Sequence, residues 1–208
     1  MFGLSKSELK IFKKLTTPIK IQDFLDSVPT NYEKKGETYM SPRRVLRTNK
    51  MHCLEGALFA ATALWLGGEP PLLLDFKNKG DEDHVVALYR RNGYWGAISK
   101  TNHSTIRFRD PVYKTIRELV MSYFHEYWRL TDGKKTLFSY SAKPFDLSKW
   151  GKSWVTDEED LFELVSAIDW APHTQIFPQK NKKYLRIADA MERKAGKLVE
   201  WDKSDLRT

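Results

Sequence analysis

The chain has 208 residues, of which 41% are hydrophobic and 30% are charged. A chain of this length can bury one hydrophobic core, and this balance of residues argues against a disordered protein. The single cysteine, Cys53, excludes both an intramolecular disulfide and a zinc site built from several cysteines. We therefore expect one domain over residues 1–208.

The distribution of lysines near the amino terminus bears on localisation. Lys6, Lys10, Lys13 and Lys14 interrupt every apolar stretch at the start of the chain. No signal-peptide core is therefore expected, and no later stretch reaches the roughly 20 apolar residues that span a membrane. These features predict a cytoplasmic protein without a membrane partner.

The chain carries 35 basic and 27 acidic residues, a formal net charge of +8. The excess lies within residues 1–50 and around Arg107, Arg109 and Lys114. A basic face of this kind can attract phosphates or an acidic protein partner, although most such excesses are simply solvated. No zinc-finger spacing or RNP-type aromatic motif accompanies the charge, so nucleic acid is not a favoured partner.

The first predicted helix begins at Thr17-Pro18, a capping residue followed by proline, and ends before Pro29. Residues 29–50 are rich in polar groups and contain two prolines, which predicts a long surface loop. The alanine-rich run 54–66 then predicts a buried helix that stops at Gly67-Gly68.

Three strand-like runs follow, at 72–76, 84–89 and 94–101. Asn92-Gly93 between the last two is a strong signal for a hairpin turn. A fourth short strand is expected to include 105–108.

The carboxy-terminal half is predicted to be helical. Asp110-Pro111 predicts the cap of a long helix, and Thr156 with Glu159 forms a capping-box pattern before a second helix. A last helix is expected from Lys183 to Ala195, ending at Gly196.

Cys53 stands at the start of the buried helix. Unpaired N–H groups and the helix dipole stabilise negative charge there, which favours the thiolate and suits a nucleophile. A lone cysteine is otherwise most often a small buried apolar residue.

His84 opens the first arm of the hairpin. If the Asn92-Gly93 turn has two residues, His84 faces Thr101 and Val86 faces Ser99. A hydroxyl on the neighbouring strand, directly across or on the diagonal, can then orient the imidazole as a base.

These residues resemble the core of the transglutaminase-like cysteine protease superfamily. The resemblance lies in Cys53-Leu-Glu-Gly-Ala, in Asp83-His84-Val-Val-Ala-Leu-Tyr and in Asn92-Gly-Tyr-Trp95-Gly-Ala-Ile-Ser, and it covers roughly residues 45–110. It implies an α+β fold with a papain-like core, in which a helix packs on an antiparallel sheet. Residues 1–44 and 111–208 are then flanking additions, expected to be mainly helical. It also implies that Cys53 attacks an amide carbonyl and that His84 acts as the base.

The third member of the triad departs from that family's pattern. Its usual aspartate falls on Ser99, which can hold an imidazole tautomer but cannot stabilise an imidazolium as a carboxylate does. Asp110 is the nearest later carboxylate, although it is better explained as a helix cap, and Asp83 points to the opposite face of the strand. Either Ser99 or Asp110 completes the triad, or the site is inactive.

Two neighbours of the cysteine need a separate interpretation. His52 is expected to be a surface or capping residue, because adjacent helix positions diverge by about 100°. The Cys53 N–H and the Asn49 amide are candidate oxyanion donors, but Asn49 equally suits a helix cap.

The leading hypothesis is an acyl-transfer enzyme that acts on protein or peptide amides as a protease, deamidase or transglutaminase. The alternative is a catalytically impaired domain of the same fold that serves as a basic protein-binding or regulatory module. No metal-ligand or phosphate-loop motif is present in the sequence, so no cofactor is expected.

Overall fold

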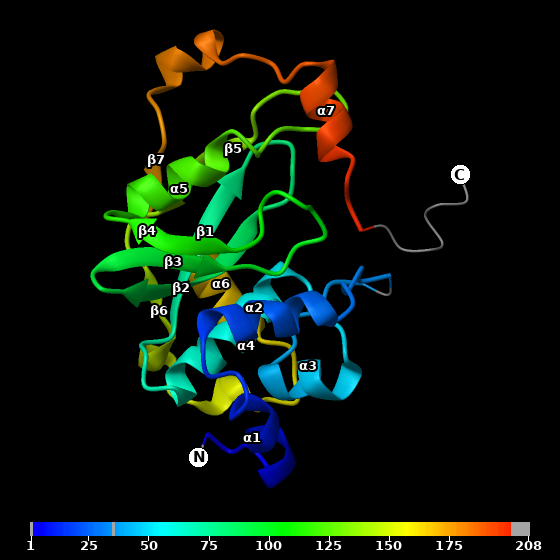
Figure 1. The fold of residues 1–208 in the computed structure, drawn as a ribbon, viewed down its shortest axis with the longest axis vertical. Coiled ribbons are helices and arrows are strands. Elements are labelled where there is room, and N and C mark those ends of the chain that lie inside the picture. Colours follow the sequence, from blue (N-terminus) through cyan, green and yellow to red (C-terminus); the bar gives the residue numbers. More distant parts are fainter. Residues whose placement is uncertain (1, 35, 201–208) are drawn as a thin grey trace.

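The computed structural model describes residues 2–34 and 36–200; residues 1, 35 and 201–208 of the expected domain lie outside them. Within these residues the protein is α+β, and its helices surround a seven-stranded antiparallel sheet (Figure 1). The strands are β1 (Leu72–Asn78), β2 (His84–Arg91), β3 (Tyr94–Ile98), β4 (Arg109–Tyr113), β5 (Leu137–Ser141), β6 (Phe145–Asp146) and β7 (His173–Gln175). Their order is β4-β3-β2-β1-β5-β7, and β6 pairs with β1 outside this path.

The described helices include seven α-helices and three short 3-10 helices. The α-helices are α1 (Lys6–Phe12), α2 (Pro18–Ser27), α3 (Pro42–Thr48), α4 (Cys53–Leu66), α5 (Ile116–Phe124), α6 (Phe162–Asp169) and α7 (Ala190–Gly196). The 3-10 helices are η1 (Leu147–Trp150), η2 (Ser153–Val155) and η3 (Gln179–Tyr184).

The sheet has a hydrophobic cluster on each face, because alternate residues of a strand point to opposite sides. On β2, Val85 and Ala87 belong to the cluster that contains α4, whereas Val86 and Leu88 belong to the cluster that contains α5. The predicted helix at 54–66 is confirmed as α4, and its residues from Leu54 to Leu64 are all buried. This central helix fixes the position of Cys53 relative to the sheet.

The predicted hairpin register is confirmed. Ala87 pairs with Ile98 and Arg91 with Tyr94, as a two-residue turn requires. Asn92 (φ 49°) and Gly93 (φ 87°) both adopt positive φ, the conformation that this turn demands. The ladder ends at Ile98, so Ser99 lies just beyond β3 rather than inside a strand that extends to 101.

The amino-terminal region contains more helix than predicted. The helix after Thr17 is confirmed as α2, with the Thr17 side chain as its cap. The prediction of a long loop over 29–50 is wrong for its second half, because α3 begins at Pro42 with Ser41 as its cap. The short helix α1 was not predicted.

The interpretation of Asp110 as a helix cap is wrong. Asp110 and Pro111 belong to the edge strand β4, where a proline is tolerated because one side of the strand has no ladder partner. The helix begins one turn later, at Ile116, with Thr115 as its cap. The strand expected at 105–108 therefore lies a few residues further on.

The carboxy-terminal half is not mainly helical, since β5, β6 and β7 complete one side of the sheet. The predicted helix after Thr156 exists as α6, but its capping residue is Leu161, which makes no side-chain capping bond. The last predicted helix is divided into η3 and α7. The positions of β5, β6 and β7 are determined by pairing with strands that are distant in the sequence, and local sequence patterns do not predict such pairing.

No helix in the described part of the chain combines the length and the apolarity needed to cross a membrane.

Candidate active site

Cys53 is the first residue of α4 and lies at the wall of a cleft, where the residue is partly exposed. Its backbone N–H makes no hydrogen bond among the described residues, as expected in the first turn of a helix. The helix thus presents both a thiol and an unused N–H group to the cleft.

His84 and Ser99 meet at the ends of their strands. The His84 Nε2 atom lies 2.7 Å from the Ser99 Oγ atom, and both residues are buried. If the register is continued one residue beyond its last pair, Ala87 with Ile98, Val86 lies opposite Ser99 and His84 reaches Ser99 on the diagonal. The bond occupies Nε2 and leaves Nδ1 as the ring nitrogen that can serve the thiol.

The backbone of Ser99 is held by α2. Its N–H donates to the Gln22 side chain at 3.0 Å, and its carbonyl accepts from the Gln22 Nε2 atom at 2.9 Å. This pair of bonds continues the strand after the ladder with β2 has ended. The helix α2 therefore holds in place Ser99, the residue that orients His84.

The Cys53 thiol is acidic for a cysteine. Burial raises its pKa, but the hydrogen bonds with His52 and His84 and the charges of both rings lower the pKa by a larger amount. The resulting pKa is about 6. An ordinary cysteine has a pKa near 8.5, so a large fraction of Cys53 is thiolate at neutral pH. The structure thus brings Cys53, His84 and Ser99 together.

His52 is the cap of α4, as predicted, but it also contacts the thiol. Its Nε2 atom donates to the Thr38 carbonyl at 2.7 Å and lies 3.4 Å from a Glu55 oxygen. Burial lowers the His52 pKa, yet its bond to Cys53 and the nearby negative charges raise it to about 9. The Leu54 N–H lies 3.3 Å from the His52 Nδ1 atom, a long contact that only a neutral ring can accept. The interactions that favour the charged ring, with Cys53 and Glu55, are stronger than this contact.

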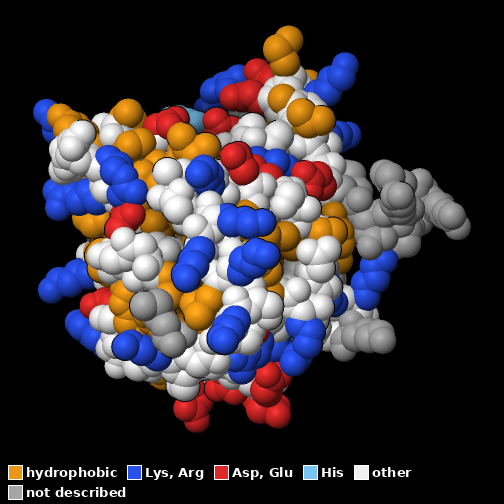
Figure 2. All heavy atoms as spheres, turned by 60° about the horizontal axis from the view of Figure 1, so that its bottom comes forward, with side chains coloured by type: hydrophobic (Ala, Val, Ile, Leu, Met, Phe, Trp, Pro, Cys, Tyr) orange, Lys and Arg blue, Asp and Glu red, His pale blue; other side chains and the backbone are white. Residues whose placement is uncertain are grey.

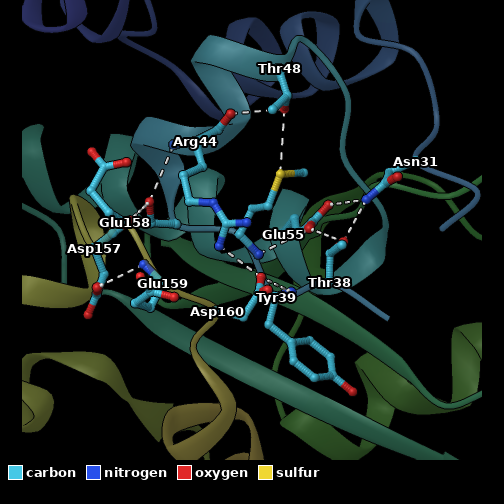
Figure 3. Close-up of polar contacts among 12 residues, drawn as sticks. Asn31, Thr38, Tyr39, Arg44, Thr48, Glu55, Asp157, Glu158, Glu159 and Asp160 are labelled. Carbon is cyan, nitrogen blue, oxygen red and sulfur yellow. Dashed lines mark hydrogen bonds and ion pairs between the residues drawn. The ribbon is translucent and has the colours of Figure 1, made fainter. Parts of the chain in front are cut away.

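Glu55 organises the loop that precedes α4. Its carboxylate is fully buried and accepts hydrogen bonds from the Met40 N–H (3.1 Å), the His52 N–H (3.0 Å) and the Thr38 hydroxyl (2.9 Å), the last of which is drawn in Figure 3. Figure 3 also shows Asn31 reaching the same carboxylate. These bonds compensate for the burial of the charge and hold His52 against Cys53.

Gly56 allows the segment after Ser99 to approach α4. A Cβ atom at this glycine would lie 2.3 Å from the Lys100 Cβ atom, so no larger residue fits without movement. The Lys100 ammonium is buried and donates to the Leu25 and Val28 carbonyls at the end of α2. Close packing therefore connects α4, α2 and the Ser99 segment around the site.

The cleft beside Cys53 and His84 has a volume of about 1010 Å³. Among the described residues, its lining contains nine carboxylates but only two lysines, Lys77 and Lys100. Lys77 forms ion pairs with Asp75 (3.1 Å), Asp83 (2.8 Å) and Asp169, and Lys100 is bound to carbonyls. The cleft of this basic protein is consequently acidic.

The remaining candidates lie elsewhere or have other partners. Asp110 is exposed on β4 and is not part of the cleft. Asp83 accepts from the Asn78 N–H at 2.7 Å and pairs with Lys77. Asn49 caps the end of α3 in a left-handed conformation (φ 51°), so of its two interpretations the helix cap is correct.

Sequence reasoning missed a second histidine site, formed by Asp75, Lys77 and His173. The buried Asp75 carboxylate lies 3.1 Å from the His173 Nε2 atom and 3.1 Å from the Lys77 ammonium. A charged residue within the apolar run Leu72-Leu-Leu-Asp75-Phe was a usable signal for a buried partner. Nothing in the sequence identified His173 as that partner.

Neither a family model nor a curated protein matches the chain at a significant level. Among the described residues, no group of three or more histidine, cysteine and acidic side chains is arranged to hold a metal ion.

Proposed function

We propose that the protein is a cysteine-dependent acyl-transfer enzyme with a transglutaminase-like core, acting on protein or peptide amides. The observation that carries this proposal is the convergence of Cys53, whose pKa lies near 6, with the His84–Ser99 pair at one cleft. A helix-borne thiol and a strand-borne histidine meet although 31 positions separate them in the sequence.

In the proposed reaction the Cys53 thiolate attacks the carbonyl carbon, and the carbonyl electron pair moves onto oxygen. Collapse of this intermediate re-forms the C=O bond and breaks the C–N bond, while His84 gives a proton to the leaving amine. Water or a second amine then attacks the thioester, with His84 accepting the proton. The outcome is hydrolysis, deamidation or crosslinking, according to the substrate and the second nucleophile.

Ser99 holds the His84 ring in this scheme without adding charge. A carboxylate in its place would stabilise the imidazolium directly. Here His52 supplies part of the missing electrostatics from the other side, because its positive ring stabilises the thiolate itself.

The acidic lining of the cleft favours the binding of substrates that are neutral or positively charged near the reacting amide. Carboxylates focus a negative potential in a narrow cleft, which repels acidic segments and concentrates cationic ones. An acidic protein partner would have to bind elsewhere.

A second candidate function is supported by the amino-terminal face. Lys6, Lys10, Lys13, Lys14 and Lys20 are all exposed on or beside α1 and α2. Figure 2 turns this end of the molecule forward and shows many lysine and arginine side chains across it. We propose this face as the surface for an acidic partner if the domain is a binding module without turnover.

The rate of alkylation of Cys53 by iodoacetamide, measured against pH, tests the leading proposal. We expect a midpoint near pH 6 and formation of a covalent acyl adduct on Cys53 with an activated ester such as p-nitrophenyl acetate, located by peptide mass. Cys53→Ala is the control and should lose both. A midpoint near 8.5 with no adduct contradicts the enzyme and favours the module.

A further inference from the structure

Tyr127 lies at the cleft beside the proposed catalytic residues. It follows α5, and its ring centre is 6.3 Å from the His84 ring and 6.3 Å from the Phe76 ring. Its backbone carbonyl accepts from the Thr136 N–H at 3.1 Å, and the next residue, Trp128, forms a bridge with Lys135. The side chain is therefore held in place from both the sheet and the segment after α5.

The Tyr127 hydroxyl lacks a partner although the residue is 95% buried, with only 5% of its surface exposed. Within the described residues this oxygen makes no hydrogen bond. Buried hydroxyls are nearly always paired, so an orphan group that lines a cleft indicates a partner that binds there. By contrast, the Tyr123 hydroxyl, also buried, donates to the Arg107 carbonyl at 3.2 Å.

The hydroxyl is suited to donate and not to ionise. Burial and the negative charge of Cys53, together with Tyr123, raise the Tyr127 pKa well above 10. No hydrogen bond joins Tyr127 to Cys53, yet the two groups are close enough for their charges to interact. Tyr127, Cys53 and His84 all line the same cleft, from which a substrate oxygen would approach this hydroxyl.

We propose that Tyr127 is a further catalytic residue, whose hydroxyl donates a hydrogen bond to the substrate carbonyl oxygen as Cys53 attacks. This role rests on the acyl-transfer function proposed above. The C–S bond forms, the carbonyl pair moves onto oxygen, and Tyr127 keeps its proton while it stabilises that charge. The unused Cys53 N–H at the start of α4 is the second donor.

Tyr127→Phe removes the hydroxyl alone and should fold normally, because it also removes an unpaired buried polar atom. We expect acylation of Cys53 by p-nitrophenyl acetate to slow roughly 100-fold, the usual effect of losing one oxyanion donor. Alkylation by iodoacetamide forms no oxyanion, so its rate and its pH midpoint should stay unchanged. The matched control, Tyr123→Phe, loses a buried hydroxyl away from the sulfur and should keep the acylation rate within about twofold.

Three results would overturn the role of Tyr127. Equal acylation in the wild type and Tyr127→Phe shows that the hydroxyl is not a donor to the reacting oxygen. Equal losses of acylation and alkylation show that it acts on the thiol instead. A wild-type protein that is not acylated at Cys53 overturns both this role and the proposed enzyme, whereas the first two results leave the enzyme intact.

Discussion

Two histidines anchored to the same sheet have opposite arrangements. His84 has a neutral partner, Ser99, and a thiol within reach, whereas His173 has a buried carboxylate, Asp75, and no cysteine beside it among the described residues. His173 lies on β7 and Asp75 on β1, and the two are joined across the intervening strand β5. A histidine–carboxylate pair therefore serves here to hold strands together, and the proposed acyl transfer depends on the Cys53 thiolate.

The largest expected effect separates the two histidines. His84→Ala should lower acyl transfer to p-nitrophenyl acetate by about 1000-fold, because it removes the proposed base and one of the groups that lower the Cys53 pKa. His173→Gln, which alters the other histidine, should change the rate less than about twofold. Burst kinetics with both variants test this contrast, and equal losses would contradict the division of roles.

The second prediction concerns stability. Asp75→Ala should lower the free energy of unfolding by about 3 kcal/mol, since it leaves Lys77 and His173 without their buried partner. Asp83→Ala removes a more exposed carboxylate from the same lysine and should cost less than about 1 kcal/mol. Urea denaturation of both variants measures the difference, and a similar small loss for both would show that Asp75 is not the anchor.

The third prediction uses the pH dependence of the thiol. The positive ring of His52 lowers the Cys53 pKa, so His52→Gln should raise that pKa from about 6 by about one unit. Alkylation at pH 6 should slow accordingly, while the rate at pH 9 should stay close to the wild-type rate. An unchanged midpoint would mean that His84 alone sustains the thiolate.

The last prediction concerns Ser99. Ser99→Ala keeps His84 but loses the 2.7 Å bond that orients it, and acyl transfer should fall by about tenfold. Ser99→Thr retains a hydroxyl and serves as the conservative comparison. A Ser99→Ala variant with wild-type kinetics would show that packing against Phe76 and Tyr127 is enough to orient the ring.

Local signals in the sequence predicted the parts of the site that depend on local structure. The start of α4 follows from the apolar run after Cys53, and the diagonal contact of His84 with Ser99 follows from the two-residue turn at Asn92-Gly93. Asp110 was misassigned because an Asp-Pro pair suits a helix start as well as an edge strand.

Other features depend on contacts between distant segments. The strands β5 and β7 are short, and they are specified by pairing with β1 and with each other. The charge on His52 depends on Cys53 and Glu55 at the start of its own helix and on the loop that carries Thr38, and of these contacts the one with Thr38 does not follow from helix spacing. The start of α3 was an exception, because Ser41-Pro42 repeats the signal that correctly identified α2.

Gly56 links the packing of α4 to the geometry of the proposed site. Because its missing side chain leaves space for Lys100, the helix and the chain after β3 can lie side by side. Even a methyl group there would meet the Lys100 Cβ atom, so either α4 or the segment of Lys100 and the adjoining Ser99 would have to move. A glycine three positions after the thiol, on the same side of the helix, thereby acts as a spacer between α4 and the segment that carries the hydrogen-bond partner of His84.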